Sequence, residues 1–261
     1  MKQFEKEELL GFFVENVNQS LLIDDIVSWV REGKQCRWLA CINPHSYALA
    51  KNNSEFTGAL HKADWLIPDG TGIVLASRVL GGKISERITG SDIFKGVHDC
   101  LNHMGGTVFL LGATEATLNK LSFRLQEKYP GISVSGSYSP PFKSAFSAKE
   151  TDEMIDAINS VSPDVLWVGM TSPKQDVWLA SNHMRLNVKF AAGVGAVFDF
   201  YSGNVERSHP IFQKLGLEWL PRLLQEPRRL WRRMLISAPI FLFDTFLARI
   251  KKSNARRTVV R

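Results

Sequence analysis

The chain has 261 residues, of which 44% are hydrophobic, 22% charged and 10% aromatic, and this composition excludes disorder, collagen and coiled coil. Its charge is unevenly distributed: residues 1–206 carry 19 Lys and Arg against 23 Asp and Glu, whereas residues 207–261 carry 13 against 3. We therefore expect one domain over residues 1–206 and a basic appendage over residues 207–261.

The cysteines and the apolar stretches indicate the cellular compartment of the protein and its relation to a membrane. There is no CxxC pair among the three cysteines, Cys36, Cys41 and Cys100, which favours a reducing compartment over a disulfide framework. The N-terminus lacks the cationic start and apolar run of a signal peptide. Residues 235–248 form the longest apolar stretch, but they fall short of the ~20 residues that a spanning helix needs. We expect a cytoplasmic protein that can lie on a membrane without crossing it.

Apolar strands alternate with amphipathic helices along the first 196 residues. In chain order, the pattern predicts a helix over 20–32 behind a possible Ser20 cap, strands over 38–42, 64–67 and 107–112, a helix over 115–128, a strand over 132–136, a helix over 149–159, a strand over 164–170, a helix over 174–184 and a strand over 188–196. This alternation indicates βαβ units. The predicted fold is α/β, a Rossmann-like mainly parallel sheet with helices on both faces, followed by a basic helical C-terminal appendage.

Polar residues follow several of these strands. Residues 43–46, 68–72, 112–114 and 171–175 stand at strand-to-helix junctions. Ligands of parallel sheets bind beyond the carboxyl ends of the strands, and the free backbone N–H groups at helix starts suit an anion such as a diphosphate. The predicted site therefore lies along this edge.

Several familiar site motifs are missing. There is no GxxxxGK[ST] loop, which excludes a P-loop nucleotidase, and no GxSxG elbow to support a serine hydrolase. Residues 193–198 (GVGAVF) keep only two glycines of a dinucleotide fingerprint, so we interpret Gly193 and Gly195 as relieving close packing. The histidines and cysteines show no zinc-site spacing, and we expect no structural metal.

Four residues near the strand ends are candidates, three of them with an ordinary structural alternative. Asp69 in IPDGTGIV projects a carboxylate into the crevice or caps the next helix. Arg87 in ERITGSD binds a phosphate or forms a surface pair with its acidic neighbours. Lys174 and Gln175 begin a helix, where a cation is disfavoured by the dipole, so Lys174 indicates an anionic ligand or is simply solvated.

The basic tail interleaves arginines with Trp and Phe over residues 217–257. Arg229, Arg232 and Arg233 would share one helical face, with Arg222 on the preceding segment. Cations beside large apolar side chains suit an anionic membrane surface. A nucleic-acid partner would not need so many apolar groups, and the acidic balance of residues 1–206 argues against one.

Taken in order, the motifs resemble one family, the WecG/TagA/CpsF glycosyltransferases, also called glycosyltransferase family 26. The resemblance covers roughly residues 20–235 and rests on this series: INPHSYALAK, ADWLIPDGTGIV, ERITGSDIF, VFLLGAT, YPGISVSGSYSPPF, PDVLWVGMTSPKQDVW, AAGVGAVFDFYSGNVER and GLEWLPRLLQEPRR. It implies an enzyme on the inner face of the bacterial plasma membrane that transfers a sugar from a UDP-sugar to a polyprenyl-diphosphate-linked saccharide, with inversion and without a metal or other cofactor. It also implies a possible homo-oligomer.

The resemblance assigns roles to individual residues. It implies that Asp69 is the general base, with Asn43 beside it in the substrate pocket. It places Arg87 and Gln175 among the substrate-binding residues. Three tail arginines would fold over the site and meet the diphosphate: Arg222, Arg229 and Arg232. In this interpretation residues 1–206 are the catalytic domain, and residues 207–261 dock on the membrane.

The chain departs from the family pattern at Cys41, Asp176 and Pro221, where Thr, Glu and Tyr are common. These changes leave the donor sugar open among N-acetylmannosamine, its uronic acid, glucose and galactose. Two other classes remain as alternatives: a non-catalytic membrane-surface or nucleic-acid binding module that uses the tail alone, and a nucleotide-dependent oxidoreductase that uses the Gly193 and Gly195 loop.

Overall fold

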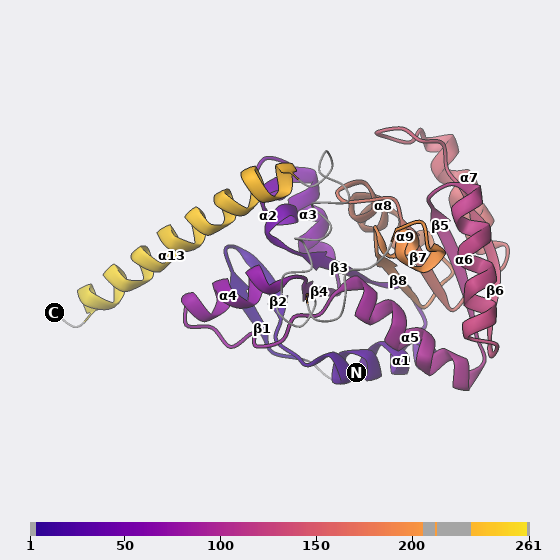
Figure 1. Cartoon of the computed structure of the whole chain (residues 1–261), viewed down its shortest axis with the longest axis horizontal. Helices are drawn as coiled ribbons and strands as arrows, with labels where there is room; N and C mark the ends of the chain where they lie inside the picture. The colour runs from indigo at the N-terminus through magenta and orange to yellow at the C-terminus, as the bar shows by residue number, and fades with distance from the viewer. Residues whose placement is uncertain (1–3, 206–211, 213–230, 260–261) are drawn as a thin grey trace.

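The structure is a computed structural model that describes residues 4–205, 212 and 231–259. Its centre is a six-stranded parallel sheet between two layers of helices (Figure 1). The strand order is β4-β3-β8-β7-β5-β6. The bounds are β3 Arg37–Ile42, β4 Trp65–Pro68, β5 Gly106–Gly112, β6 Ile132–Tyr138, β7 Val165–Gly169 and β8 Phe190–Gly193. The predicted α/β fold with a parallel sheet is confirmed.

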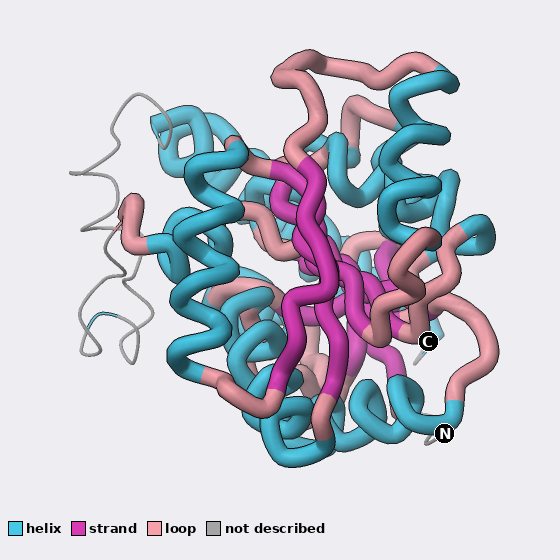
Figure 2. The backbone as a smooth tube through the Cα atoms, turned by 90° about the vertical axis from the view of Figure 1, so that its right-hand side faces the viewer, coloured by secondary structure: helices cyan, strands magenta, loops and turns pink. Residues whose placement is uncertain are grey.

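Helices cover both faces of the sheet because successive strand residues point to opposite sides. In β3, Leu39 joins one apolar cluster, whereas Trp38 and Ala40 join the other. The Leu39 side is covered by α1 Gln19–Glu32, α5 Gly90–Met104, α6 Glu115–Lys128 and α9 Val197–Ser202. The opposite side is covered by α2 Pro44–Ala50, α3 Ser54–Lys62, α4 Thr71–Val79, α7 Ala148–Asn159 and α8 Lys174–Asn182. Figure 2 shows the strands running between these layers.

The predicted helices and strands match the structure to within a few residues. The helix over 115–128 is α6, with the predicted bounds. The predicted Ser20 cap is wrong: α1 begins at Gln19, and the side chain of Asn18 accepts the Leu21 N–H at 2.9 Å. The helix predicted over 174–184 ends earlier, at Asn182, and a 3₁₀ turn, η1 (His183–Arg185), follows it.

An N-terminal hairpin escaped the sequence pattern. Strands β1 (Lys6–Leu9) and β2 (Phe12–Glu15) pair antiparallel outside the main sheet. The Glu7 carboxylate fastens the hairpin to the domain by accepting the backbone N–H groups of Lys83 (2.6 Å) and Ile84 (3.1 Å).

The C-terminal segment, residues 231–259, consists of two helical residues, Trp231 and Arg232, then a π-helical turn η2 (Arg233–Ser237) and the helix α13 (Ala238–Val259). The first turns of α13 lie against α2, and Phe241 is only 1% exposed, with its ring centroid 5.4 Å from that of Tyr47. The Tyr47 hydroxyl donates to Asp244 at 2.9 Å, and Lys51 pairs with the same carboxylate at 2.7 Å. No helix within the described residues is long and apolar enough to span a membrane.

Candidate active site

A pocket of about 460 Å³ opens at the carboxyl ends of β3, β4, β7 and β8, where the sequence predicts the site. The α/β domain supplies most of its wall, and the C-terminal segment supplies the rest. The residues that the C-terminal segment contributes are Arg233, Ala238, Phe241 and Leu242. A volume of this size suits a small organic ligand of the size of a nucleotide.

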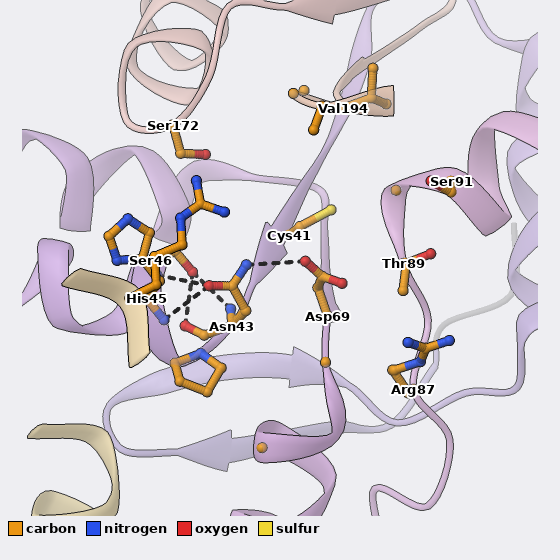
Figure 3. Close-up of a pocket in the computed structure, with 18 of the residues that line it drawn as sticks. Cys41, Asn43, His45, Ser46, Asp69, Arg87, Thr89, Ser91, Ser172 and Val194 are labelled. Atoms are coloured by element: carbon orange, nitrogen blue, oxygen red, sulfur yellow. Dashed lines mark hydrogen bonds between the residues drawn. The ribbon is translucent and has the colours of Figure 1, made fainter. Parts of the chain in front are cut away.

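Asn43 connects the start of α2 to the pocket. It is the N-cap of α2, and its Oδ1 accepts the backbone N–H groups of His45 (3.0 Å) and Ser46 (2.9 Å). Because Oδ1 is engaged in this way, Nδ2 faces the pocket, where it donates to Asp69 Oδ2 at 3.0 Å (Figure 3). The predicted neighbours Asn43 and Asp69 are therefore in direct contact.

Asp69 continues β4 and turns its side chain into the pocket. Its backbone N–H donates to the carbonyl oxygen of Ile42 in the neighbouring strand β3 at 2.8 Å. The alternative in which Asp69 caps the next helix is wrong, because the N-cap of α4 is Gly70 at φ +94°. Gly72 lets this turn approach α2, since a Cβ there would lie 2.6 Å from Pro44 Cγ.

Gln175 braces the loop after β8. Its side chain is 4% exposed, and its Oε1 accepts the Gly195 N–H at 3.1 Å. A Cβ at Gly193 would lie 2.7 Å from Gln175 Nε2, and Gly195 has φ +53°. The interpretation as close packing is confirmed for Gly193, whereas at Gly195 a Cβ would lie an ordinary 3.8 Å from Gln175 Oε1 and it is the positive φ that favours glycine.

Asp176 is a second, buried carboxyl beside the pocket. It is 1% exposed and accepts the Ser172 hydroxyl at 2.6 Å, and burial raises its pKa to about 7. Cys41 also lines the pocket, and burial, followed by the nearby carboxyls of Asp69 and Asp176, raises the pKa of its thiol well above the ordinary value. The Cys41 side chain therefore lines the pocket as a neutral thiol.

Two arginines line the pocket from different elements. Arg87 comes from the loop before α5 and Arg233 from η2. The sequence interpretation selected Arg232 instead, but that side chain is exposed, with its guanidinium carbon 5.4 Å from the centroid of the Trp231 ring. The other predicted tail arginines, Arg222 and Arg229, lie outside the described residues.

Lys174 does not line the pocket. Its Nζ donates to the carbonyl of Lys143 at 2.9 Å and lies 4.9 Å from the centroid of the Phe146 ring. Partial burial there lowers the pKa of its ammonium group. The structure therefore brings together four of the predicted residues, Asn43, Asp69, Arg87 and Gln175, and places Lys174 beside them on the outside.

The pocket also contains His45 and Arg233, which the sequence analysis noted within residues 43–46 and on the basic face of the tail but did not select as site residues. The His45 ring Nδ1 lies 2.9 Å from Ser237 Oγ, and burial, with the nearby Arg233, lowers its pKa to about 4. Their position was the available sequence signal, since His45 stands two residues after Asn43 and Arg233 is next to Arg232. Within the described residues, no group of three or more His, Cys, Asp or Glu is placed to hold a metal ion.

A carboxylate that an amide orients can accept a proton, and guanidinium groups on two sides can bind an anionic substrate. Fold and site together fit one class, an α/β enzyme with a base and an anion-binding pocket at the carboxyl edge of its sheet. More particularly, the chain belongs to the glycosyl transferase WecG/TagA/CpsF family, whose model matches residues 7–255. The predicted family is confirmed, and the protein is a glycosyltransferase.

Curated relatives agree with the family assignment. The chain is 32% identical to an N-acetylglucosaminyldiphosphoundecaprenol N-acetyl-beta-D-mannosaminyltransferase of Bacillus spizizenii, over 76% of this chain and 74% of the relative. It is 28% identical to a protein of the same name from Staphylococcus aureus strain MW2, over 96% of both chains. These findings set aside the alternatives of a non-catalytic binding module and an oxidoreductase.

Proposed function

We propose that this glycosyltransferase transfers a sugar of the N-acetylmannosamine type from a UDP-sugar to a polyprenyl-diphosphate-linked saccharide during assembly of a bacterial cell-surface polymer. The names of the relatives support the lipid-linked acceptor and the sugar. The observation that carries the proposal is the contact between Asn43 and Asp69 inside the pocket.

Asp69 acts as the general base in this proposal. It takes the proton from the acceptor hydroxyl as the oxygen attacks the anomeric carbon, and the bond from that carbon to the donor diphosphate breaks. Attack opposite the leaving group inverts the anomeric centre, which turns an α-linked donor into the β-linked product that the relatives' names state. Asn43 positions the base, because its Nδ2 donates a hydrogen bond to Asp69 Oδ2 and so fixes the direction of the carboxylate.

Positive charge in the pocket stabilises the departing diphosphate, with no metal required. Arg87 and Arg233 reach the pocket from two sides, which supports this role. Arg222, Arg229 and Arg232 remain proposed diphosphate ligands on the strength of the resemblance. Gln175 contributes indirectly by holding the Gly195 loop, and Lys174 stays a proposed anion-binding residue at the pocket's outer rim.

A membrane surface supplies the acceptor. The exposed side chains of the C-terminal segment support docking on an anionic bilayer, since Leu235 is 71% exposed and Phe243 and Phe246 are each 61% exposed. We propose that the protein works peripherally on the inner face of the plasma membrane.

Replacing Asp69 with Asn tests the reaction. The variant keeps the shape of the side chain but cannot accept the proton, so we expect sugar transfer to fall at least about a hundredfold with an unchanged melting temperature. The measurement is release of UDP and formation of product from UDP-N-acetylmannosamine and a lipid-diphosphate-linked N-acetylglucosamine. Asp152→Asn, which changes an exposed carboxylate on α7, is the matched control. Full turnover in Asp69→Asn would remove Asp69 from the mechanism.

A screen of UDP-sugars by thermal shift addresses the donor. A ligand that binds only the folded protein raises its melting temperature in proportion to occupancy, so the true donor should give a larger shift than its epimers. If no UDP-sugar stabilises the protein, the proposed donor class is wrong.

A further inference from the structure

The helix α2 holds the C-terminal segment through two separate polar contacts. One lies at the pocket, where His45 Nδ1 meets Ser237 Oγ at 2.9 Å and the Ser237 side chain is buried. The other lies outside the pocket lining, where Tyr47 and Lys51 hold Asp244. Only the first contact adjoins the reacting groups.

His45 makes contacts in two directions. Its ring meets Ser237 in η2. Its backbone N–H donates to Oδ1 of Asn43, whose Nδ2 donates to Asp69 (Figure 3). A continuous set of hydrogen bonds therefore runs from the C-terminal segment to the carboxylate. The same short element, η2, also carries Arg233, which lines the pocket.

The chemistry of the ring suits this contact. Burial is the main reason that the pKa of His45 falls to about 4, and the positive charge of Arg233 adds to it. The ring is therefore neutral near pH 7, and either neutral tautomer forms one hydrogen bond with a hydroxyl group. A neutral ring also avoids repulsion of the guanidinium beside it.

We propose that His45 is a positioning residue for sugar transfer: its ring seats Ser237 so that η2 closes the pocket wall and presents Arg233 beside the Asn43 and Asp69 pair. The inference rests on the proposed function, since it assigns a role in the same pocket. His45 acts through the segment that it holds and takes no part in the bond changes.

Steady-state kinetics of three variants test this role. A hydrogen bond between neutral groups is worth about a factor of five in an equilibrium. Because the donor must bind the seated form, His45→Ala should raise the KM for the donor, by at most about fivefold, and saturating donor should keep kcat within about a factor of two. Ser237→Ala should have the same effect, and the double variant should be no worse than either single variant. His45→Asn should restore KM, because its Oδ1 replaces the ring Nδ1 as the partner of Ser237.

Tyr47→Phe is the matched control, since it removes one hydrogen bond between α2 and the C-terminal segment away from the pocket while Lys51 still holds Asp244. We expect its KM to equal that of the wild type. Additive losses in the double variant, an His45→Asn variant no better than His45→Ala, or an equal loss in Tyr47→Phe would each overturn the proposal.

Hydrogen exchange of the ligand-free protein separates this inference from the proposed function. Amides over residues 235–245 should exchange about fivefold faster in His45→Ala than in the wild type, and His45→Asn should restore the slower rate. Unchanged exchange in His45→Ala would overturn the seating role whatever the enzyme transfers. If the wild type transfers no sugar, the proposed function and the catalytic part of this inference fail, whereas the exchange result still decides whether His45 seats the segment.

Discussion

Asn43 shows how one side chain can serve both fold and site. Its Oδ1 satisfies two N–H groups at the start of α2, which have no partners inside the helix. These contacts fix the direction of the amide and aim its donor group at Asp69. The orientation of the proposed base is therefore a consequence of helix capping, and it costs the protein no additional ordered side chain.

Asp176 shows the opposite case, a carboxyl that burial keeps from ionising. Its only polar side-chain partner given by the structure is the Ser172 hydroxyl, and desolvation raises its pKa from an ordinary 3.8 to about 7. The folded protein thus holds this proton up to about pH 7, whereas the unfolded chain releases it near pH 4. Between these values the native state binds more protons, so the contribution of Asp176 to stability falls as pH rises.

Asp176→Asn should remove this dependence. The amide is neutral at every pH and its Oδ1 still accepts the Ser172 hydroxyl, so the variant should gain stability relative to the wild type between about pH 5 and pH 8, by an amount on the order of a few kcal/mol. Urea unfolding at the two pH values measures it. The exposed Asp152→Asn variant is the control, and parallel pH profiles for Asp176→Asn and the wild type would contradict the assignment.

At the scale of elements, α13 has two distinct faces. Phe241 is 1% exposed and Thr245 5% exposed, on the face that meets α2, whereas Phe243 is 61% exposed. Residues two apart on a helix point about 200° from each other, so two neighbouring phenylalanines serve opposite surroundings. The buried face attaches the segment to the domain, and the exposed face remains available for another surface.

Phe241→Ala should loosen this attachment. Removing a buried phenylalanine costs about 3 kcal/mol or more, so amides in the first turns of α13 should exchange at least about a hundredfold faster. Phe243→Ala is the matched control on the same helix, and its exchange should change less than about threefold because the side chain is already in solvent. Equal effects of the two variants, measured by hydrogen-exchange mass spectrometry, would show that Phe241 does not anchor the segment.

At the scale of the whole molecule, net positive charge and exposed apolar side chains are concentrated in the C-terminal part. Residues 207–261 hold 13 of the 32 basic residues and 3 of the 26 acidic ones. Figure 1 shows α13 leaving the body of the domain, with its first turns beside α2. The exposed apolar side chains on this segment include Leu235, Leu242, Phe243, Phe246 and Ile250. The pocket shares Leu242 with this surface, so a bilayer on it would lie at the pocket rim.

The double variant Phe243→Ser with Phe246→Ser should bind anionic vesicles at least about tenfold more weakly, because each buried phenylalanine contributes about 1.5–3 kcal/mol. Transfer to a lipid-embedded acceptor should fall with it, whereas transfer to a detergent-soluble, short-chain acceptor should not. Vesicle flotation and the two transfer assays measure these effects.

Phe123→Ser provides the control, since Phe123 is 68% exposed on α6, away from the C-terminal segment. If this control weakens vesicle binding as much as the double variant does, general surface hydrophobicity explains the binding and the membrane face is misplaced.

The layers of the fold and four of the pocket residues could be predicted, because both depend on local patterns in the sequence. Alternating strand and helix periodicity is written into neighbouring residues, and a parallel sheet necessarily brings its strand ends to one edge. Asn43, Asp69, Arg87 and Gln175 follow or adjoin such ends, and all four line one pocket. The short helices α2, α3 and α4 gave weaker signals, because seven to nine residues complete few helical turns.

Which of two adjacent residues faces the pocket was decided only in three dimensions. Lys174 points outward while Gln175 points in, and Arg232 is exposed while Arg233 lines the wall. Neighbours on a helix differ by about 100° in direction, and the helix is free to rotate until its side chains meet the rest of the protein. Composition and periodicity thus dictated the α/β layers and the edge of the sheet that carries the site. How the C-terminal segment is turned against α2 was decided by long-range contacts, such as His45 with Ser237 and Tyr47 with Asp244. The sequence pattern could not predict these contacts, because the partners lie more than 190 residues apart in the chain.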